Sequence, residues 1–313
     1  VRMGKLSPQS VSEIVNTVLG EAEHDFAEKI YNLVDGHPLA LIYLLNALGQ
    51  ADSKEDYKII LDEATPYKGD IEKQYFAHWV KIEEDQEFKE FLGLLARIRG
   101  PIPMAWVAKW AEKPLLEKLK KVWGQYFTSD SMGRWEFFHN SFKIFLEEKT
   151  ADNLPGLTSA QIDQQYHLGL AQRYKEADSP WKWETLYHFY KTEDHEKVLE
   201  IAQYDWFKEQ VEAFRPIDAI ETDVRLAVKS AGVLLDAVAL LRFTLVGASL
   251  QQRANVLEDT ELPYLLLETG HTEIATDYAR DGVRLRLDDK AALFFARNLV
   301  DINPNDARRV FEC

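Results

Sequence analysis

The chain has 313 residues, of which 46% are hydrophobic, 28% charged and 12% aromatic, and its formal net charge is −15. This composition is typical of a globular protein and too apolar for a disordered chain. A chain of this length is expected to form two or three domains rather than one. The acid excess disfavours non-specific binding to nucleic acid or to anionic lipid, because both need a positive field.

Cysteine usage and apolar runs predict where the protein resides. The one cysteine is the last residue, Cys313, which excludes a disulfide framework and favours a cytoplasmic protein. No uninterrupted apolar run reaches the roughly 18 residues of a membrane span, and the start is not a signal peptide. The chain begins at Val1 without an initiator Met, and the last helical pattern continues to Cys313. We therefore expect a piece of a longer protein.

Residues 1–66 have helical periodicity and predict a small helical bundle. The first helix has Ser7 as its N-cap, followed by proline at the first helical position. A second helix ends at Gly36, and a third runs apolar from Pro38 to Gly49. No strand pattern occurs in this segment.

Residues 67–150 predict a winged-helix domain. The expected helices span residues 71–82, 88–98, 104–110, 113–126 and 140–148. Between the last two, the residues on both sides of the turn cluster Asp130-Ser131-Met132-Gly133 are strand-like, which indicates one β-hairpin. Helices followed by one hairpin and one more helix are the pattern of a winged helix.

Residues 151–313 follow a helix-breaking cluster at 152–156 and are expected to be entirely helical. Two stretches, 188–202 and 265–279, align with each other. They share Thr192 with Thr269, Glu196 with Glu273, and Ala202 with Ala279. Further copies are expected near Asp236 and Asp306. Such spacing indicates stacked helical hairpins of the tetratricopeptide type.

The sequence excludes several kinds of active site. Neither a GxxxxGK[ST] phosphate loop nor a GxGxxG motif is present. The eight histidines are scattered without an HExxH pair, and one terminal cysteine does not make a zinc motif. We therefore expect no catalytic residues and no metal ligands, and this chain is not expected to be an enzyme by itself.

Two short motifs have a physical rationale. In Gly36-His37-Pro38, the glycine can adopt the left-handed conformation that reverses the chain, and the proline starts the next helix with φ already set. In Phe138-His139-Asn140-Ser141, Asn140 or Ser141 can cap the last helix of the winged helix. His139 then stands beside a helix N-terminus, where an imidazole can add a donor to a phosphate. A plain helix–turn–helix connection and a packed structural histidine remain the alternatives.

In this order the two motifs resemble those of a known family. The stretches NLVDGHPLALIYLLNALG (Asn32 to Gly49) and RWEFFHNSFKIFLEEK (Arg134 to Lys149) are similar to the part of STAND-class signalling ATPases that follows the phosphate-loop domain. This class includes the NACHT and NB-ARC proteins, many of them linked to defence or signal transduction. The resemblance covers residues 1–150, and beyond it only the general character of a helical array matches.

The resemblance implies roles for individual residues. The Gly36-x-Pro38 junction would place Pro38 near the adenine of bound ADP or ATP, and His139 would contact the β-phosphate of ADP in the closed state. The nucleotide, with Mg²⁺, would be held by an upstream domain of the same polypeptide, so this chain alone should not bind it tightly. The helical repeats would sense a protein ligand or other trigger. Oligomerisation on activation stays open.

One alternative is a DNA-binding regulator that uses the winged helix directly. Its candidate recognition helix carries Lys113, Lys118, Lys120 and Lys121, but Glu112 interrupts the patch. A face of lysines on a helix is usually solvated surface, so nucleic-acid binding is not the expected function.

The other alternative is a helical-repeat scaffold that only binds proteins. Residues 1–150 carry 19 basic and 24 acidic side chains, so 10 of the 15 net negative charges lie in residues 151–313. An acidic array suits a basic partner, although carboxylates also keep a large helical surface hydrated.

Overall fold

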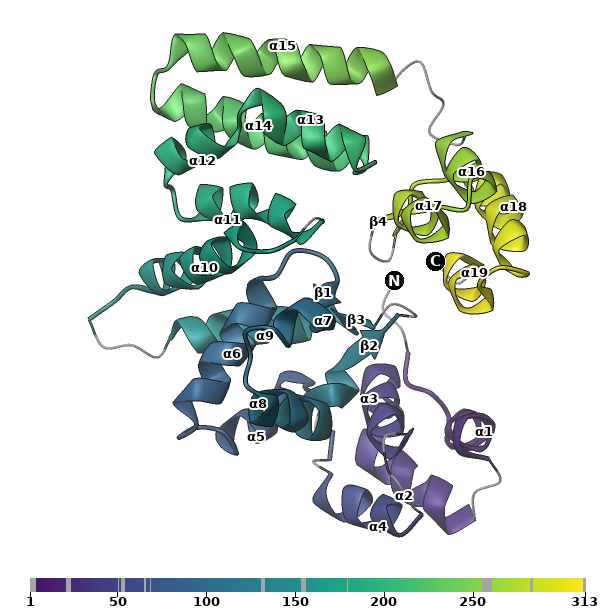
Figure 1. Cartoon of the computed structure of the whole chain (residues 1–313). Helices are drawn as coiled ribbons and strands as arrows, with labels where there is room; N and C mark the ends of the chain where they lie inside the picture. The colour runs from purple at the N-terminus through teal and green to yellow at the C-terminus, as the bar shows by residue number, and fades with distance from the viewer. Residues whose placement is uncertain are drawn as a thin grey trace. The chain divides into compact units, whose positions relative to one another are not determined.

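The computed structural model (Figure 1) is mainly helical with a small sheet, as predicted. It describes residues 4–20, 24–49, 51, 54–64, 66–67, 69–130, 133–152, 156–178, 180–254, 261–281 and 284–311. Cys313 and the central turn residues Ser131 and Met132 lie outside this set. The chain forms two compact units. The first comprises residues 1–96, 103–129 and 133–153, and the second comprises 97–102, 130–132 and 154–313. The finer division into 1–66, 67–150 and 151–313 stays a prediction.

The first unit begins with a helical bundle. Its helices are α1 (Pro8–Leu19), α2 (His24–Val34), α3 (Pro38–Gly49) and α4 (Lys54–Glu63). The predicted cap of α1 is present, since the Ser7 hydroxyl accepts the Ser10 amide at 3.1 Å. Apolar side chains at helical spacing, such as Val11 and Val15 of α1 and Leu41 and Leu45 of α3, meet in one buried cluster.

The winged-helix part of this unit contains the predicted hairpin. Its elements are α5 (Glu72–Val80), α6 (Gln86–Arg97), β1 (Ile102–Pro103), α7 (Met104–Val107), α8 (Lys113–Lys118), η1 (Leu119–Trp123), η2 (Gly124–Tyr126), β2 (Phe127–Ser129), β3 (Arg134–Phe137) and α9 (Asn140–Ala151). Strands β2 and β3 are antiparallel, with Phe127 opposite Phe137. A short strand that the sequence did not predict, β1, completes the sheet in the order β1-β3-β2.

The helix expected over 113–126 is divided into three segments. The α-helical start, α8, passes into a π-helical turn, η1, and then a 3-10 turn, η2. The backbone becomes extended at Phe127 (φ −121°, ψ 154°), where β2 begins. The same residues are therefore helical, as expected, but without one regular axis.

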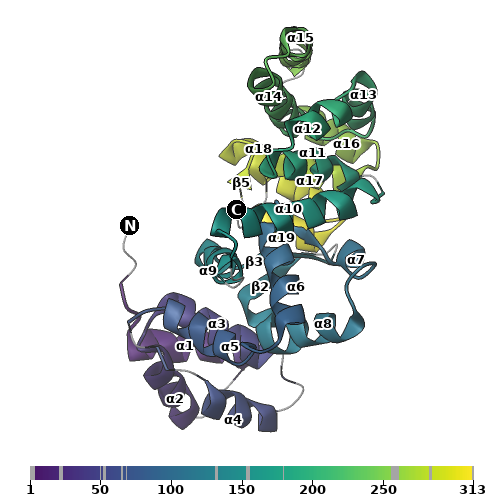
Figure 2. The ribbon, with the colours of Figure 1, turned by 90° about the vertical axis from the view of Figure 1, so that its left-hand side faces the viewer.

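The second unit consists of helical hairpins. Its elements are α10 (Ser159–Lys175), η3 (Trp181–Glu184), α11 (Thr185–Lys191), α12 (His195–Ile201), α13 (Tyr204–Glu212), α14 (Ile217–Val233), α15 (Ala237–Ala254), α16 (Glu261–Glu268), α17 (Thr272–Ala279), β4 (Arg280–Asp281), β5 (Arg284–Leu285), α18 (Asp289–Leu299) and α19 (Pro304–Phe311). Helices α10, α11, α12, α14 and α15 follow one another as a stack in both views (Figure 1, Figure 2).

The expectation that residues 151–313 are entirely helical is wrong at one place. After α17 the backbone becomes extended at Arg280 (φ −129°, ψ 149°), and β4 pairs antiparallel with β5. The Arg286 amide then donates to the Ala279 carbonyl at 3.0 Å, which closes this small ladder against the end of α17. The Arg286 amide and the Ala279 carbonyl are thus both hydrogen-bonded outside a helix.

The weak sequence repeat corresponds to a shared backbone turn. The matched residues hold equivalent positions in hairpins α11–α12 and α16–α17, since the threonine of each follows the end of the first helix and the alanine of each is fully buried. The residue just before the cap of the second helix has positive φ in both, 60° at Glu193 and 83° at Gly270. Leu235, ahead of α15, is also left-handed, with φ 54°. The turn near Asp236 therefore shares this backbone feature, while the repeat copy expected there stays a prediction.

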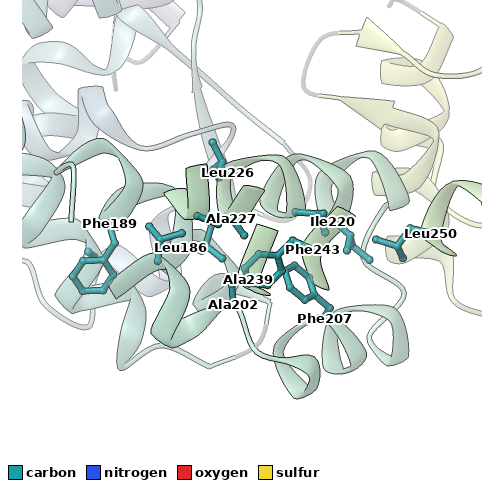
Figure 3. Close-up of a cluster of buried hydrophobic side chains, with 14 residues drawn as sticks. Leu186, Phe189, Ala202, Phe207, Ile220, Leu226, Ala227, Ala239, Phe243 and Leu250 are labelled. Atoms are coloured by element: carbon teal, nitrogen blue, oxygen red, sulfur yellow. The ribbon is translucent and has the colours of Figure 1, made fainter. Parts of the chain in front are cut away.

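Two separate buried clusters stabilise the second unit. One joins α10 to α15 and is drawn in Figure 3, where Phe207 and Phe243 lie close, with ring centroids 6.3 Å apart. The other joins α16 to α19 around Phe295. Among the described residues, no helix has both the length and the apolarity that crossing a membrane requires.

Candidate functional site

The Gly36-His37-Pro38 junction forms the sharp turn that its residues predict. Gly36 is buried with φ 67°, and a Cβ atom there would lie 2.4 Å from the Leu6 carbonyl oxygen. The Leu6 amide donates to the Gly36 carbonyl at 2.8 Å. Only glycine fits both the conformation and this close backbone approach. Pro38 is half-buried as the first residue of α3.

His37 is the side chain that holds the junction. Its Nδ1 accepts the Ala40 amide at 3.3 Å, which caps α3, and its ring stacks on Tyr67 with centroids 4.3 Å apart. Burial lowers the pKa of His37, and the nearby Lys5 cation lowers it further. Both effects favour the neutral imidazole, whose free Nδ1 lone pair is what the cap requires.

At the second motif, His139 itself is the N-cap of α9. Its Nδ1 accepts the Ser141 amide at 3.2 Å and lies 2.8 Å from the Ser141 hydroxyl. The expectation that Asn140 or Ser141 caps this helix is therefore wrong. Because Nδ1 accepts, the neutral ring carries its proton on Nε2. His139 is exposed, so this Nε2–H donor lies beside the helix N-terminus in reach of solvent.

A chain of hydroxyl groups connects the second motif to the helix that the first motif begins. The Ser141 hydroxyl lies 2.9 Å from the Tyr75 hydroxyl of α5, which lies 3.0 Å from the Tyr43 hydroxyl of α3. Burial raises the pKa of both tyrosines, so each stays protonated and able to donate. We call Tyr43, Tyr75, Ser141 and His139 the hydroxyl relay. It runs from the exposed imidazole to the helix that begins at Pro38.

Aromatic rings enclose the relay. Tyr43 meets Tyr126 edge-on at 4.8 Å and Phe138 at 5.9 Å, while Tyr126 stacks on Phe142 at 4.3 Å. Such contacts exclude water and fix the hydroxyl positions. The helix carrying Pro38 and the segment carrying His139 are therefore joined by one packed, hydrogen-bonded centre.

A cavity of about 1180 Å³ lies in the same unit. Apolar residues of α3 and α4, including Leu44, Ala47 and Ile60, form one side, and residues from η1 to β2, together with Trp135, form the other. Neither Pro38 nor His139 lines this cavity, whereas Tyr43 of the relay does. The relay therefore extends to the cavity wall.

Charged side chains of both signs line this cavity. Lys81, Lys120 and Lys121 line it and are exposed. His78 lines it as well, and burial together with Lys81 lowers its pKa to about 4. Asp56, Glu63 and Glu117 line it too, so three carboxylates balance the three ammonium groups and the lining favours neither sign of ligand charge.

The second unit contains a buried charged centre, made of Arg99, Glu184, Arg215 and Asp223. Arg99 holds Glu184 through two hydrogen bonds of 2.7 and 3.0 Å, and Arg215 bridges Glu184 at 3.1 Å and Asp223 at 2.5 Å. Burial favours the protonated form of Glu184, but the two arginines outweigh it, so the pKa of Glu184 is lowered. At Asp223, burial outweighs the arginines, and the pKa is raised.

Arg99 reaches this centre from a segment with an unusual position in the chain. Residues 97–102 belong to the second unit, although the residues before and after them in sequence, in α6 and α7, belong to the first. Arg97 of the same segment donates to Asp163 of α10 at 2.6 Å. Two arginines of one short segment are therefore engaged by carboxylates of the helical array.

Sequence reasoning singled out His139 of the hydroxyl relay but not the tyrosines. Gly36 forms the left-handed turn that its motif predicts, His139 is itself the cap rather than the residue ahead of it, and Tyr43, Tyr75 and the role of Ser141 were missed. A signal for the tyrosine pair was present in the sequence, because each of two predicted helices carries a tyrosine on its apolar face. A buried tyrosine hydroxyl needs a hydrogen-bonding partner.

Comparison with protein-family models finds no match, and searches among curated proteins and among solved structures find none either.

Proposed function

We propose that residues 1–150 are the lid of a STAND-type signalling ATPase and that residues 151–313 are its sensor. The lid would close on ADP or ATP held by a phosphate-loop domain upstream in the same polypeptide, in the cytoplasm. Recognition of a protein trigger by the helical array would release it. The observation that carries this proposal is the hydroxyl relay, because it fixes His139 relative to the helix that Pro38 begins.

The geometry of His139 supports contact with a phosphate. Its Nδ1 is used by the cap, so its exposed Nε2–H donates outward beside the positive end of a helix of 12 residues. A hydrogen bond to a charged phosphate oxygen from this donor is worth about 1.5–3 kcal/mol. The chain supplies this edge of a nucleotide site and an apolar junction at Pro38; the upstream domain would supply the phosphate loop and Mg²⁺.

The placement of residues 97–102 supports coupling between sensor and lid. This segment connects two helices of the winged helix in the sequence, while Arg97 and Arg99 are bound by carboxylates of the array. A change in the array that releases these arginines would therefore free the segment that joins the end of α6 to the start of β1. No nucleotide contact is needed for this step.

The contacts of the lysines disfavour the DNA-binding alternative. Lys118 pairs with Asp85 and lies over the Phe88 ring, and Lys113 pairs with Glu117 at 3.6 Å. Two of the four lysines on the candidate recognition helix are thus already engaged by carboxylates, which leaves fewer cations for phosphates.

The experiment compares three forms of the full-length polypeptide: the parent, His139→Ala and His139→Asn. Asparagine keeps an N-cap acceptor but lacks the imidazole donor, so it separates capping from phosphate contact. ADP dissociation, followed with a fluorescent analogue, should become about 10–100-fold faster in both variants. An ADP dissociation rate unchanged in both variants would contradict the role of His139, and an upstream sequence without a phosphate loop would contradict the class.

A further inference from the structure

Helix α15 presents an apolar stripe that the described part of the chain leaves exposed. Val238, Leu241 and Leu245 are 78%, 63% and 62% exposed, and Ala248 continues the row. Their spacing of three, four and three residues is that of a seam between two helices. Large exposed apolar patches of this kind mark interaction sites.

The other face of α15 is already used. Ala239, Phe243 and Leu250 point into the buried cluster shared with α14, and Val246 packs beside them (Figure 3). Helix α15 is therefore apolar on two faces, whereas a surface helix needs only one. The second face requires a separate explanation.

The turn before α15 extends the stripe at an unfavourable backbone position. Leu235 precedes Val238 by three residues, has φ 54° and is 89% exposed. The equivalent turn positions are occupied by Glu193, which is polar, and by Gly270, which adopts positive φ without strain. A left-handed leucine costs free energy and gains nothing from solvent. Leu235 therefore adds a further exposed apolar side chain at the start of α15.

The charge around the stripe identifies its occupant. Helix α15 contains no aspartate or glutamate over 18 residues, in a chain with net charge −15. Asp236 is used as its N-cap, since it accepts the Ala239 amide at 3.0 Å. Arg242 lies over the Phe243 ring at 4.7 Å and donates to Gln203 at 3.4 Å. On α15, the exposed residues beside the stripe are thus neutral groups such as Thr244 and Ser249 and one cation, Arg242, with no carboxylate among them.

We infer that α15 is the contact surface for a second copy of this chain, with two α15 helices antiparallel across a two-fold axis. Acidic chains repel each other, so a helix without carboxylates is where two copies approach at least cost. A stripe of this spacing is complementary to itself when reversed, which sets Leu241 opposite the partner's Leu245. A helix of 18 residues is about 27 Å long, enough for four such layers.

The test uses the full chain and sedimentation equilibrium over a range of concentrations. The parent should reach twice the mass of one chain, and more readily in about 0.5 M salt than in about 0.05 M salt, because salt screens the repulsion. Leu241→Glu with Leu245→Glu should weaken the dimer by at least about 100-fold, since charges would be buried in an apolar seam. Leu293→Glu, an equally exposed leucine on α18, is the matched control and should leave the dimer unchanged.

A charge exchange makes the assignment specific. A chain with Leu241→Lys and Leu245→Lys should also be monomeric, while its mixture with the glutamate variant should restore the dimer, because each glutamate then faces a lysine. As a second measurement, a Leu241→Cys chain mixed with a Leu245→Cys chain, both with Cys313→Ser, should cross-link through a disulfide when a mild thiol oxidant is added to take up the two electrons. A monomeric parent, a dimer that persists in the glutamate variant, or a mixture that stays monomeric would each overturn the inference.

Discussion

The two units are organised around centres of opposite chemistry. In the first unit, neutral tyrosine and serine hydroxyls form the hydroxyl relay inside a shell of aromatic rings. In the second, two arginines and two carboxylates form a buried charged centre. Neutral hydrogen bonds lose a modest free energy when one partner is removed, whereas a buried charge left without its partner costs far more. The two units should therefore differ in their tolerance of single substitutions.

The largest expected effect is on the charged centre. Arg215→Met leaves Glu184 and the fully buried Asp223 with only Arg99, so we expect the free energy of unfolding to fall by about 3–5 kcal/mol. Urea unfolding with hydrogen exchange over α14 would locate the loss in this unit. Arg225→Met, which breaks an exposed pair with Glu221 on the same helix, should cost no more than about 0.5 kcal/mol. Equal losses in the two variants would remove the distinction between buried and exposed pairs.

A pH-dependent effect follows from His78 in the first unit. Burial lowers its pKa from 6.5 to about 4, so between these values the unfolded chain binds a proton that the folded chain does not. Stability from the neutral His78 is therefore complete above pH 6.5 and is lost as pH falls towards 4, by about 3 kcal/mol in all.

The measurement for His78 is the free energy of unfolding at a series of pH values for the parent and His78→Phe. Phenylalanine keeps a ring against Trp123 and Tyr126 but cannot titrate. Between pH 6.5 and 4, the free energy of unfolding should fall less in the variant than in the parent, by the loss assigned to His78. The contributions of the other titrating groups are the same in both proteins and cancel in this difference. Parallel pH profiles would show that His78 titrates normally.

A smaller effect is expected at the centre of the hydroxyl relay. Tyr75→Phe removes the hydroxyl that contacts both Tyr43 and Ser141, so the buried Tyr43 hydroxyl loses its partner. We expect a loss of about 1–3 kcal/mol in thermal or urea unfolding. Tyr204→Phe, on an exposed ring, is the control and should have no measurable effect. A Tyr75→Phe value as large as that of Arg215→Met would break the contrast between the two centres.

The sequence predicted those features that depend on neighbouring residues. Helix α3 runs from Pro38 to Gly49 as expected, because proline and glycine mark its ends locally. The Ser7 cap and the β2–β3 hairpin follow from similarly short-range patterns. The prediction for the cap of α9 was wrong because histidine is an uncommon N-cap. A histidine can accept the capping hydrogen bond only when its Nδ1 lone pair is free.

Neither centre could be predicted, because each joins residues far apart in the chain. Tyr75 meets Tyr43 across 32 residues and Ser141 across 66, and Arg99 meets Glu184 across 85. Periodicity places each of these side chains on a helix face but does not say which faces meet. Residues 97–102, which lead from α6 to β1, belong to the second unit, and no pattern in the neighbouring sequence predicts this.

The smallest prediction separates local backbone cost from the charged centre of the same unit. Hairpins α11–α12 and α16–α17 share a left-handed turn residue, Glu193 in one and Gly270 in the other. Gly270→Ala should cost about 1 kcal/mol, because a side chain is disfavoured at φ 83° even though open space surrounds the position. Glu193→Gly should change stability by no more than about 0.5 kcal/mol, because relief of strain is offset by the greater freedom of glycine in the unfolded chain. Both values come from differential scanning calorimetry. If the two substitutions instead cost as much as Arg215→Met, the stability of the array would reside in its turns, and the charged centre would not be what distinguishes this unit.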